Sequence, residues 1–570
     1  MSKLSIYQVL PRLFGNTQPN PKLFGSAQEN GVGKMNDFTD KALQEIKALG
    51  INYIWYTGII EHATCQSYLG YKIFGQNPSV VKGRAGSPYA ITDYYDVNPY
   101  LAESIPDRMH EFEQLVQRTH KNGLKVIIDF IPNHLARPYH SDQFPATDFG
   151  LNDDATQAFS PKNDFYYIPG QPLQWNDQMG TLLPGEKREP YLEFPAKATG
   201  NDQFHPNPSI YDWYETVKLN YGVDYLNQKQ QHFDPIPPLW DKMVAVLRFW
   251  ASKNIDAFRC DMAEMVPVEF WNYAVTNLKQ EFPELLFIAE VYNPNLYHAY
   301  IYQGKFDYLY DKVGLYDTLR AIICCGIPAS DITRCWQHLN GLDAYMLRFL
   351  ENHDEQRIAS EFFAKKPEQA LPGMIVSATL GTGPVMVYFG QEVGEPAKGI
   401  SGYSGDDGKT TIFDFWVVPE FQKWLNNNKF DGARLSESQK NLRQAYTQLL
   451  NLTLSSQPLS HGNFYDLMWA NHFDHGPDPQ FIYAYLRYTA NEYALIVVNF
   501  NKYTSQKFKL KIPEHAFGEM KISISAKLEF TPVFGFGETF SISAVDTAYK
   551  GMELTVKPSS GVIFIFKPHN

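Results

Sequence analysis

The chain has 570 residues, of which 44% are hydrophobic and 20% are charged. These proportions are ordinary for a globular protein and exclude wholesale disorder or a fibrous protein. At this length, the usual domain size predicts several domains or one large barrel with additions. The net charge of −12 comes from 50 Lys and Arg against 62 Asp and Glu. No basic block is dense enough to follow a phosphate backbone, so we expect no nucleic-acid partner.

The cysteines and the apolar runs bear on the compartment. The chain has 5 cysteines, an odd number without CxxC spacing. Neither a disulfide framework nor a cysteine zinc site is therefore predicted, and a reducing compartment fits best. The start, MSKLSIYQVLPRLFG, lacks the apolar run of a secretory signal, and no run of about 18 apolar residues could cross a bilayer. We therefore predict a cytoplasmic protein with no membrane partner.

Short apolar runs alternate along the chain with helical patterns, which is typical of a parallel α/β sheet or barrel. Helical spacing occurs at residues 38–49, 107–121 and 239–252, and the first of these ends at Gly50. Eight apolar runs are strand candidates, and eight such strands predict a (β/α)8 TIM barrel. They are residues 5–10, 51–57, 124–131, 255–261, 285–292, 306–310, 345–351 and 385–389.

Two long stretches depart from this alternation. About a hundred residues after His134 are rich in Pro, Gly, Asn and Asp, which is too long for a plain loop and predicts a subdomain inserted after strand three. Beyond a helical pattern near residues 435–452, strand-like runs and turn residues predict a C-terminal all-β sandwich domain. The predicted units are the barrel in residues 1–134 and 236–457, the inserted subdomain in 135–235 and the sandwich in 458–570.

Polar side chains stand at the ends of four candidate strands, where barrel enzymes place their chemistry. In the stretch NIDAFRCDMAEM, residues 254–265, side chains alternate between faces, so Arg259 and Asp261 share one face. That pair could be a structural ion pair, and an isolated Asp or His at a strand end is usually a cap or a satisfied polar residue. Agreement between four strand ends favours a functional site. The other polar residues are His134, Glu290, His353 and Asp354.

The residue types at these ends indicate the chemistry. The chain has neither an HExxH metal motif nor a cysteine cluster nor a nucleophilic serine elbow. Paired carboxylates without these features favour acid/base and nucleophilic work on an acetal, which is glycoside hydrolysis.

The motifs DFIPNH, FRCD, IAEV and ENHD, in this order, resemble the four short conserved regions of the α-amylase superfamily of retaining glycoside hydrolases. The predicted layout of barrel, insertion after strand three and C-terminal sandwich is similar as well, so the resemblance covers nearly the whole chain. It implies that Asp261 is the nucleophile, that Glu290 is the general acid/base, and that Asp354 is the third carboxylate, which binds sugar hydroxyls.

The resemblance also implies roles for residues around the carboxylates. Arg259 would hold Asp261 ionised. His134 and His353 would donate hydrogen bonds to the sugar next to the scissile bond, and Tyr89, in the segment SPYAITDYY, would stack on its ring.

A structural calcium ion is less well supported by the resemblance. Asn133 matches a calcium ligand of the family, but an Asn after a strand is equally a capping residue. Many starch-cleaving members carry a Lys-His pair after the nucleophile, and the His carbonyl helps bind the ion, whereas Glu264 and Met265 stand here. Calcium takes about six to eight oxygen ligands. We therefore expect no required cofactor, with calcium as the open alternative.

Taken together, the resemblance implies an enzyme that cleaves α-1,4-glucosidic bonds in starch-type glucans or maltooligosaccharides. The alternatives are an α-glucan transglycosylase or an α-1,6- or trehalose-acting member, since these share the catalytic residues. A barrel that binds sugar without turnover is a further alternative, against which the intact Asp261, Glu290 and Asp354 argue. The sequence leaves the oligomeric state open.

Overall fold

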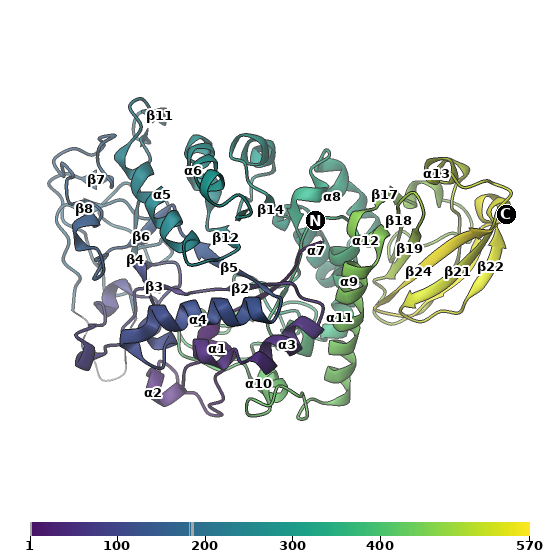
Figure 1. The fold of residues 1–570 in the computed structure, drawn as a ribbon, viewed down its shortest axis with the longest axis horizontal. Helices are drawn as coiled ribbons and strands as arrows, with labels where there is room; N and C mark the ends of the chain where they lie inside the picture. Colours follow the sequence, from purple (N-terminus) through teal and green to yellow (C-terminus); the bar gives the residue numbers. More distant parts are fainter. Residues whose placement is uncertain (1–2, 182, 184–186, 188, 570) are drawn as a thin grey trace.

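The computed structural model describes residues 3–181, 183, 187 and 189–569. A barrel surrounded by helices forms the larger part, and an antiparallel β domain, yellow in Figure 1, lies beside it and contains the C-terminus. In the described part of the chain, no helix has the length and apolar character needed to cross a membrane.

All eight predicted barrel strands are present and parallel, in the order β15-β14-β13-β12-β5-β2-β1-β16. A parallel bridge between Arg348 and Val385 joins the two ends of this sheet. The sheet therefore closes, which confirms the predicted (β/α)8 TIM barrel. The strands are β1 (Ser5–Val9), β2 (Tyr53–Tyr56), β5 (Lys125–Phe130), β12 (Ala257–Cys260), β13 (Leu286–Ala289), β14 (Tyr308–Tyr310), β15 (Met346–Leu347) and β16 (Val385–Tyr388).

The helical spacing at residues 38–49, 107–121 and 239–252 and near 435–452 correctly predicts four of the helices. The first long one, α3 (Asp40–Ala48), starts at Thr39, whose hydroxyl accepts a hydrogen bond from the Ala42 N–H, and it stops before Gly50 at φ +99°. The other long helices are α4 (Arg108–Lys121), α5 (Pro238–Ala251), α6 (Val268–Glu281), α7 (Asp317–Cys325), α8 (Ile332–His338), α9 (Leu371–Thr379) and α11 (Glu437–Ser455). Helix α10 (Pro419–Leu425) is as long as α8, and the shorter helices are α1 (Pro11–Phe14), α2 (Ala27–Asn30) and α12 (Gln457–His461).

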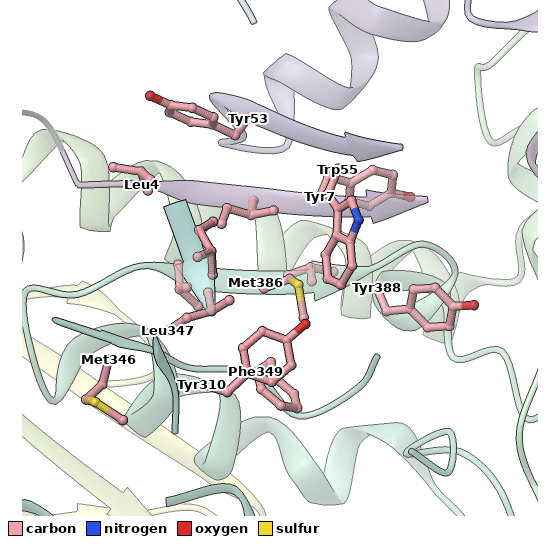
Figure 2. Close-up of a cluster of buried hydrophobic side chains, with 14 of the residues drawn as sticks. Leu4, Tyr7, Tyr53, Trp55, Tyr310, Met346, Leu347, Phe349, Met386 and Tyr388 are labelled. Carbon is pink, nitrogen blue, oxygen red and sulfur yellow. The ribbon is translucent and has the colours of Figure 1, made fainter. Parts of the chain in front are cut away.

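The barrel interior is filled by side chains. Figure 2 shows Trp55, Tyr310 and Met386 meeting there from β2, β14 and β16, and all three are buried. Large aromatic side chains bury much apolar surface, and a close-packed interior resists displacement of the strands that carry it. The core therefore fixes the carboxyl ends of the strands, where the polar residues lie.

The predicted insertion after β5 consists of short antiparallel pairs. In the first pair, β6 (His134–Ala136) bonds to β9 (Thr216–Lys218), with His134 opposite Lys218. Because β6 follows β5 almost directly, this pair ties the insertion to the carboxyl end of the barrel. The other pairs in the loops are β3 (Ile60–His62) with β4 (Ile91–Val97), β7 (Tyr167–Ile168) with β8 (Ala196–Lys197), and β10 (Val223–Asp224) with β11 (Gln230–Gln231).

The C-terminal domain has a six-stranded antiparallel sheet in the order β17-β18-β19-β24-β21-β22 and a second sheet of β20 with β23. This arrangement confirms the predicted all-β sandwich. Its elements are β17 (Asn463–Asp466), β18 (Ile482–Tyr488), β19 (Tyr493–Asn499), β20 (Gln506–Leu510), α13 (Glu514–Met520), β21 (Lys527–Phe534), β22 (Phe540–Ser543), α14 (Ala544–Tyr549), β23 (Met552–Val556) and β24 (Ser560–His569).

One buried arginine joins the two parts. Helices α9 and α12 pack against β18, β19 and β24, and Arg487 of β18 lies in this contact. Its guanidinium donates hydrogen bonds to the carbonyls of Leu380 at 3.0 Å, Gly462 at 2.6 Å and Pro458 at 3.3 Å. Burial lowers the pKa of Arg487 to about 10, so the group stays charged at neutral pH.

Replacement of this side chain by an apolar one tests its contribution to stability. Arg487→Met removes the hydrogen bonds to these three buried carbonyls, of which that of Pro458 keeps the Gly462 N–H as a donor. We expect a loss of about 3 kcal/mol in the free energy of unfolding, measured in urea. Arg334→Met is the matched control, because that side chain is 74% exposed and should cost less than about 0.5 kcal/mol. Equal unfolding curves for the two variants would show that the Arg487 side chain does not stabilise the contact between the two parts.

Candidate active site

The centre of the polar cluster is the guanidinium of Arg259, a residue on β12 that is only 1% exposed. One terminal nitrogen donates to Asp261 Oδ1 at 2.8 Å, and the other forms an ion pair with Glu290 Oε2 at 2.8 Å. The Nε–H donates to the Tyr310 hydroxyl at 3.1 Å. Asp261 and Glu290, which end two neighbouring strands, are therefore close enough for one side chain to bridge them.

Asp261 is buried beside this positive charge. Burial raises the pKa of the Asp261 carboxyl, and the Arg259 guanidinium opposes that rise. Asp129, at the end of β5, also lies beside the arginine. Its Oδ1 is 3.6 Å from a terminal nitrogen of Arg259, and its Oδ2 accepts a hydrogen bond from the indole of Trp55 at 3.0 Å. The arginine thus has three carboxylate neighbours, which compensate the cost of burying its charge.

Glu290 is held from two other directions. Its Oε2 accepts a hydrogen bond from the Met262 N–H at 2.8 Å, and its Oε1 accepts one from the Tyr292 hydroxyl at 2.6 Å. Met262 has a left-handed backbone with φ +40°, which a non-glycine residue rarely adopts. This turn directs the Met262 N–H toward Glu290 immediately after the strand that carries Asp261.

His353 and Asp354 lie beyond the carboxyl end of β15. The His353 Nε2 lies 3.0 Å from Asp354 Oδ2 and 2.5 Å from the Tyr89 hydroxyl, while its Nδ1 contacts the Gln8 amide at 2.8 Å. Burial alone would raise the pKa of Asp354, but the interaction with His353 lowers it to about 2. The ring of Tyr89 stacks on that of His353, with 5.1 Å between centroids and 26° between the ring planes.

His134 stands at the start of β6, and its ring lies 5.1 Å from the ring of Trp213. Burial and the charges of Lys218 and Lys82 lower the pKa of His134 to about 3, so the imidazole is neutral at neutral pH.

The structure brings all the residues predicted for catalysis and sugar binding to one end of the barrel. They are Tyr89, His134, Arg259, Asp261, Glu290, His353 and Asp354.

Asn133, the candidate ligand for the alternative with calcium, is buried next to a positive charge of the protein itself. Its side-chain oxygen accepts a hydrogen bond from the Lys218 ammonium at 2.7 Å, and its amide donates to the Gly200 carbonyl at 2.7 Å. Lys218 also pairs with Asp202 at 2.6 Å. An ammonium group repels a divalent cation, so these residues do not fit an all-oxygen calcium site. Among the described residues, no three His, Cys, Asp or Glu are grouped to hold a metal.

A cavity of about 220 Å³ is lined by six of the predicted residues, which are Tyr89, His134, Asp261, Glu290, His353 and Asp354. Besides the predicted residues, it is lined by several that the sequence analysis did not identify. These include Lys82, Trp213, Glu215, Tyr292 and Phe413. Tyr292 could have been found from its place two residues after Glu290, on the same face of an extended segment. The others lie in loops that show no periodic pattern.

Comparison with known proteins agrees with this geometry. A family model described as the α-amylase catalytic domain matches residues 8–413. An α-amylase from Dictyoglomus thermophilum is 23% identical over 77% of this chain and 76% of its own length. An α-amylase from Streptomyces lividans is 24% identical over 67% of this chain, but the match spans 42% of that relative's length.

Among solved structures, a maltogenic α-amylase from Thermotoga neapolitana superposes with a TM-score of 0.61 at 20% identity. The alignment covers 99% of this chain and 98% of that one, so the two proteins share their fold over the full length, including the C-terminal domain. Because the family model covers the barrel together with its insertion and the polar strand ends, the chain belongs to the α-amylase family of glycoside hydrolases.

Proposed function

We propose that this glycoside hydrolase cleaves α-1,4-glucosidic bonds in starch-type glucans or maltooligosaccharides with retention of configuration. The observation that carries the proposal is the bridging of Asp261 and Glu290 by Arg259 within one cavity. Retaining enzymes need their two carboxyl groups only about 5 to 5.5 Å apart, whereas inverting enzymes leave room for a water molecule between them. The α-1,4 linkage is supported by the similarity to an α-amylase over most of the chain.

The reaction would proceed in two displacements. Asp261 attacks the anomeric carbon while Glu290 gives its proton to the leaving oxygen, which forms a covalent glycosyl-enzyme. Glu290 then takes a proton from a water molecule, and that water displaces Asp261. Arg259 fixes the attacking carboxylate, and the Tyr292 hydroxyl and the Met262 N–H fix the acid.

The remaining polar residues would bind the sugar. Asp354, His353 and His134 line the cavity and present a carboxylate and two imidazoles to sugar hydroxyls, and Tyr89 presents a ring. Transfer to another sugar, or action on α-1,6 or trehalose links, would use the same groups. Products from maltooligosaccharides, starch, pullulan and trehalose separate these alternatives. The cytoplasmic location stays a prediction.

The stereochemistry tests the role of Asp261. We expect the first product released from maltopentaose to be the α-anomer, observed by proton NMR before mutarotation, because two inversions restore the original configuration. Asp261→Asn should lower kcat at least about 10⁴-fold, as loss of a nucleophile does, with an unchanged circular dichroism spectrum. An initial β-anomer would show that no glycosyl-enzyme forms on Asp261.

The role of Glu290 is tested by changing the leaving group. Glu290→Gln cannot supply a proton, so hydrolysis of maltopentaose should fall about 10²- to 10⁴-fold. Formation of the glycosyl-enzyme from α-maltosyl fluoride, whose leaving group needs no general acid, should fall far less. We expect a fluoride burst followed by slow turnover, and azide should speed that turnover. If both substrates lost the same factor, Glu290 would not be the acid.

We further propose that the enzyme requires no calcium. The melting temperature should not change after exhaustive treatment with EDTA or after calcium is restored, because the Lys218 ammonium already satisfies Asn133. Lys218→Met should instead lower it by about 2 to 4 °C, since Asn133 and Asp202 lose their cation. A reversible fall on chelation of the wild-type protein would show that calcium binds through other ligands.

A further inference from the structure

A charged pair that takes no part in the proposed chemistry stands in the wall of the catalytic cavity. The Lys82 ammonium lies 2.8 Å from Glu215 Oε1, and the two side chains are 13% and 6% exposed. Both residues line the cavity that also contains Asp261 and Glu290. They come from different segments, because Lys82 lies in the loop between β3 and β4 and Glu215 directly precedes β9 in the insertion.

The pair lies next to His134. Strand β9 is bonded to β6, and the Arg137 N–H donates to the Glu215 carbonyl at 3.0 Å, so Glu215 is fixed beside the strand that begins with His134. The ring of Trp213, two residues earlier, packs on the His134 ring. The charge of Lys82 is also close enough to help depress the pKa of His134. By contrast, Glu290 is held by Met262 and Tyr292, which come from other strand ends.

Both charged groups have unused hydrogen-bonding capacity. Glu215 Oε2 is buried and has no hydrogen-bond partner among the residues that the structure describes. The Lys82 ammonium has three N–H donors, and its described contacts are the ion pair and the face of the Tyr214 ring at 5.3 Å. An unpartnered buried carboxylate oxygen is unfavourable, and a hydroxyl donor in the cavity would relieve that cost.

The alternative explanation is purely structural, namely that the ion pair attaches the loop between β3 and β4 to the insertion. Neutral hydrogen bonds already make that attachment, from the Thr181 hydroxyl to the Val81 carbonyl at 3.0 Å and from the Ser79 hydroxyl to the Glu189 carbonyl at 2.5 Å. A buried ion pair adds little net stability because desolvation offsets its attraction. Its position in the wall of the cavity is better explained by a ligand with hydroxyl groups.

We propose that Lys82 and Glu215 bind hydroxyl groups of the sugar unit held beside His134, on the glycone side of the scissile bond. This inference rests on the proposed function and names a specificity determinant within it. Glu215 accepts a hydrogen bond from one hydroxyl, and Lys82 donates one to a neighbouring hydroxyl oxygen. Because a buried polar group left unpaired is costly, such a wall would reject sugars that lack the matching hydroxyl.

The test measures kcat/KM on p-nitrophenyl α-maltoside and on analogues in which a single hydroxyl of the glycone is replaced by hydrogen. With the wild-type enzyme, kcat/KM for at least one deoxy analogue should be about 10- to 100-fold lower than for the parent maltoside, which corresponds to the loss of a hydrogen bond to a charged group. The double variant Lys82→Met with Glu215→Leu leaves neither charge unpaired. With this variant, kcat/KM for the same analogue should be less than about threefold lower than for the parent maltoside. This difference in penalties reports contact with that hydroxyl rather than general damage.

Two further variants keep the test decisive. Glu215→Gln retains the shape of the side chain and should reduce the same penalty in part, even if the double variant does not fold. Glu193→Gln is the matched control, because Glu193 forms a buried ion pair with Arg137 at 2.6 Å in the same insertion and is not among the residues that line the cavity. It should keep every deoxy penalty of the wild type.

The outcomes separate this inference from the proposed function. Suppose that the wild-type enzyme is active and that the double variant and Glu215→Gln show the same deoxy penalties as the wild type. That result would overturn only the role of Lys82 and Glu215. Wild-type enzyme that turns over neither p-nitrophenyl α-maltoside nor maltopentaose would remove the proposed function, and the inference with it. A reduced penalty in the variants, with the control unchanged, would establish the contact.

Discussion

The site depends on one buried cation, the guanidinium of Arg259. Its full burial would be prohibitively costly without anions, and the carboxylates of Asp129, Asp261 and Glu290 surround it. The register of the parallel strands produces this arrangement, because Arg259 on β12 lies level with Asp129 on β5 and Ile288 on β13. Glu290 follows two residues after Ile288, on the same face. The register of the backbone pairing therefore determines how far apart the charged groups lie.

This dependence explains what could be predicted from the sequence. Strand alternation places Arg259 and Asp261 on one face, and parallel strands bring their carboxyl ends to the same edge, so the cluster follows once the eight strands are found. The strands themselves are visible as apolar runs because both of their faces are buried. The roles assigned to the carboxylates came from the family resemblance, since strand geometry alone does not distinguish a nucleophile from a structural anion.

The wall of the cavity could not be predicted in the same way. Lys82, Trp213, Glu215 and Phe413 are separated by up to hundreds of residues and lie in loops without periodic spacing. Their meeting depends on tertiary contacts, such as the pairing of β6 with β9 and the close approach of Gly83, at φ +69°, to the Phe413 carbonyl. Neither contact has a local sequence signal. Asn133 shows the related difficulty, because its neighbour Lys218 is 85 positions away and alters what the asparagine can bind.

The electrostatics of the cavity favour a cationic transition state over the neutral substrate. Asp354 is 40% exposed on its side chain yet has a pKa of about 2, so it stays ionised near Asp261. His134 remains neutral because burial, Lys218 and Lys82 oppose its protonation, and it adds no positive charge to the cavity. Positive charge that develops on the sugar ring therefore meets the Asp354 carboxylate already in place, which needs no reorganisation. The attraction between this carboxylate and the sugar ring is stronger in the cationic transition state than in the neutral substrate, as catalysis requires.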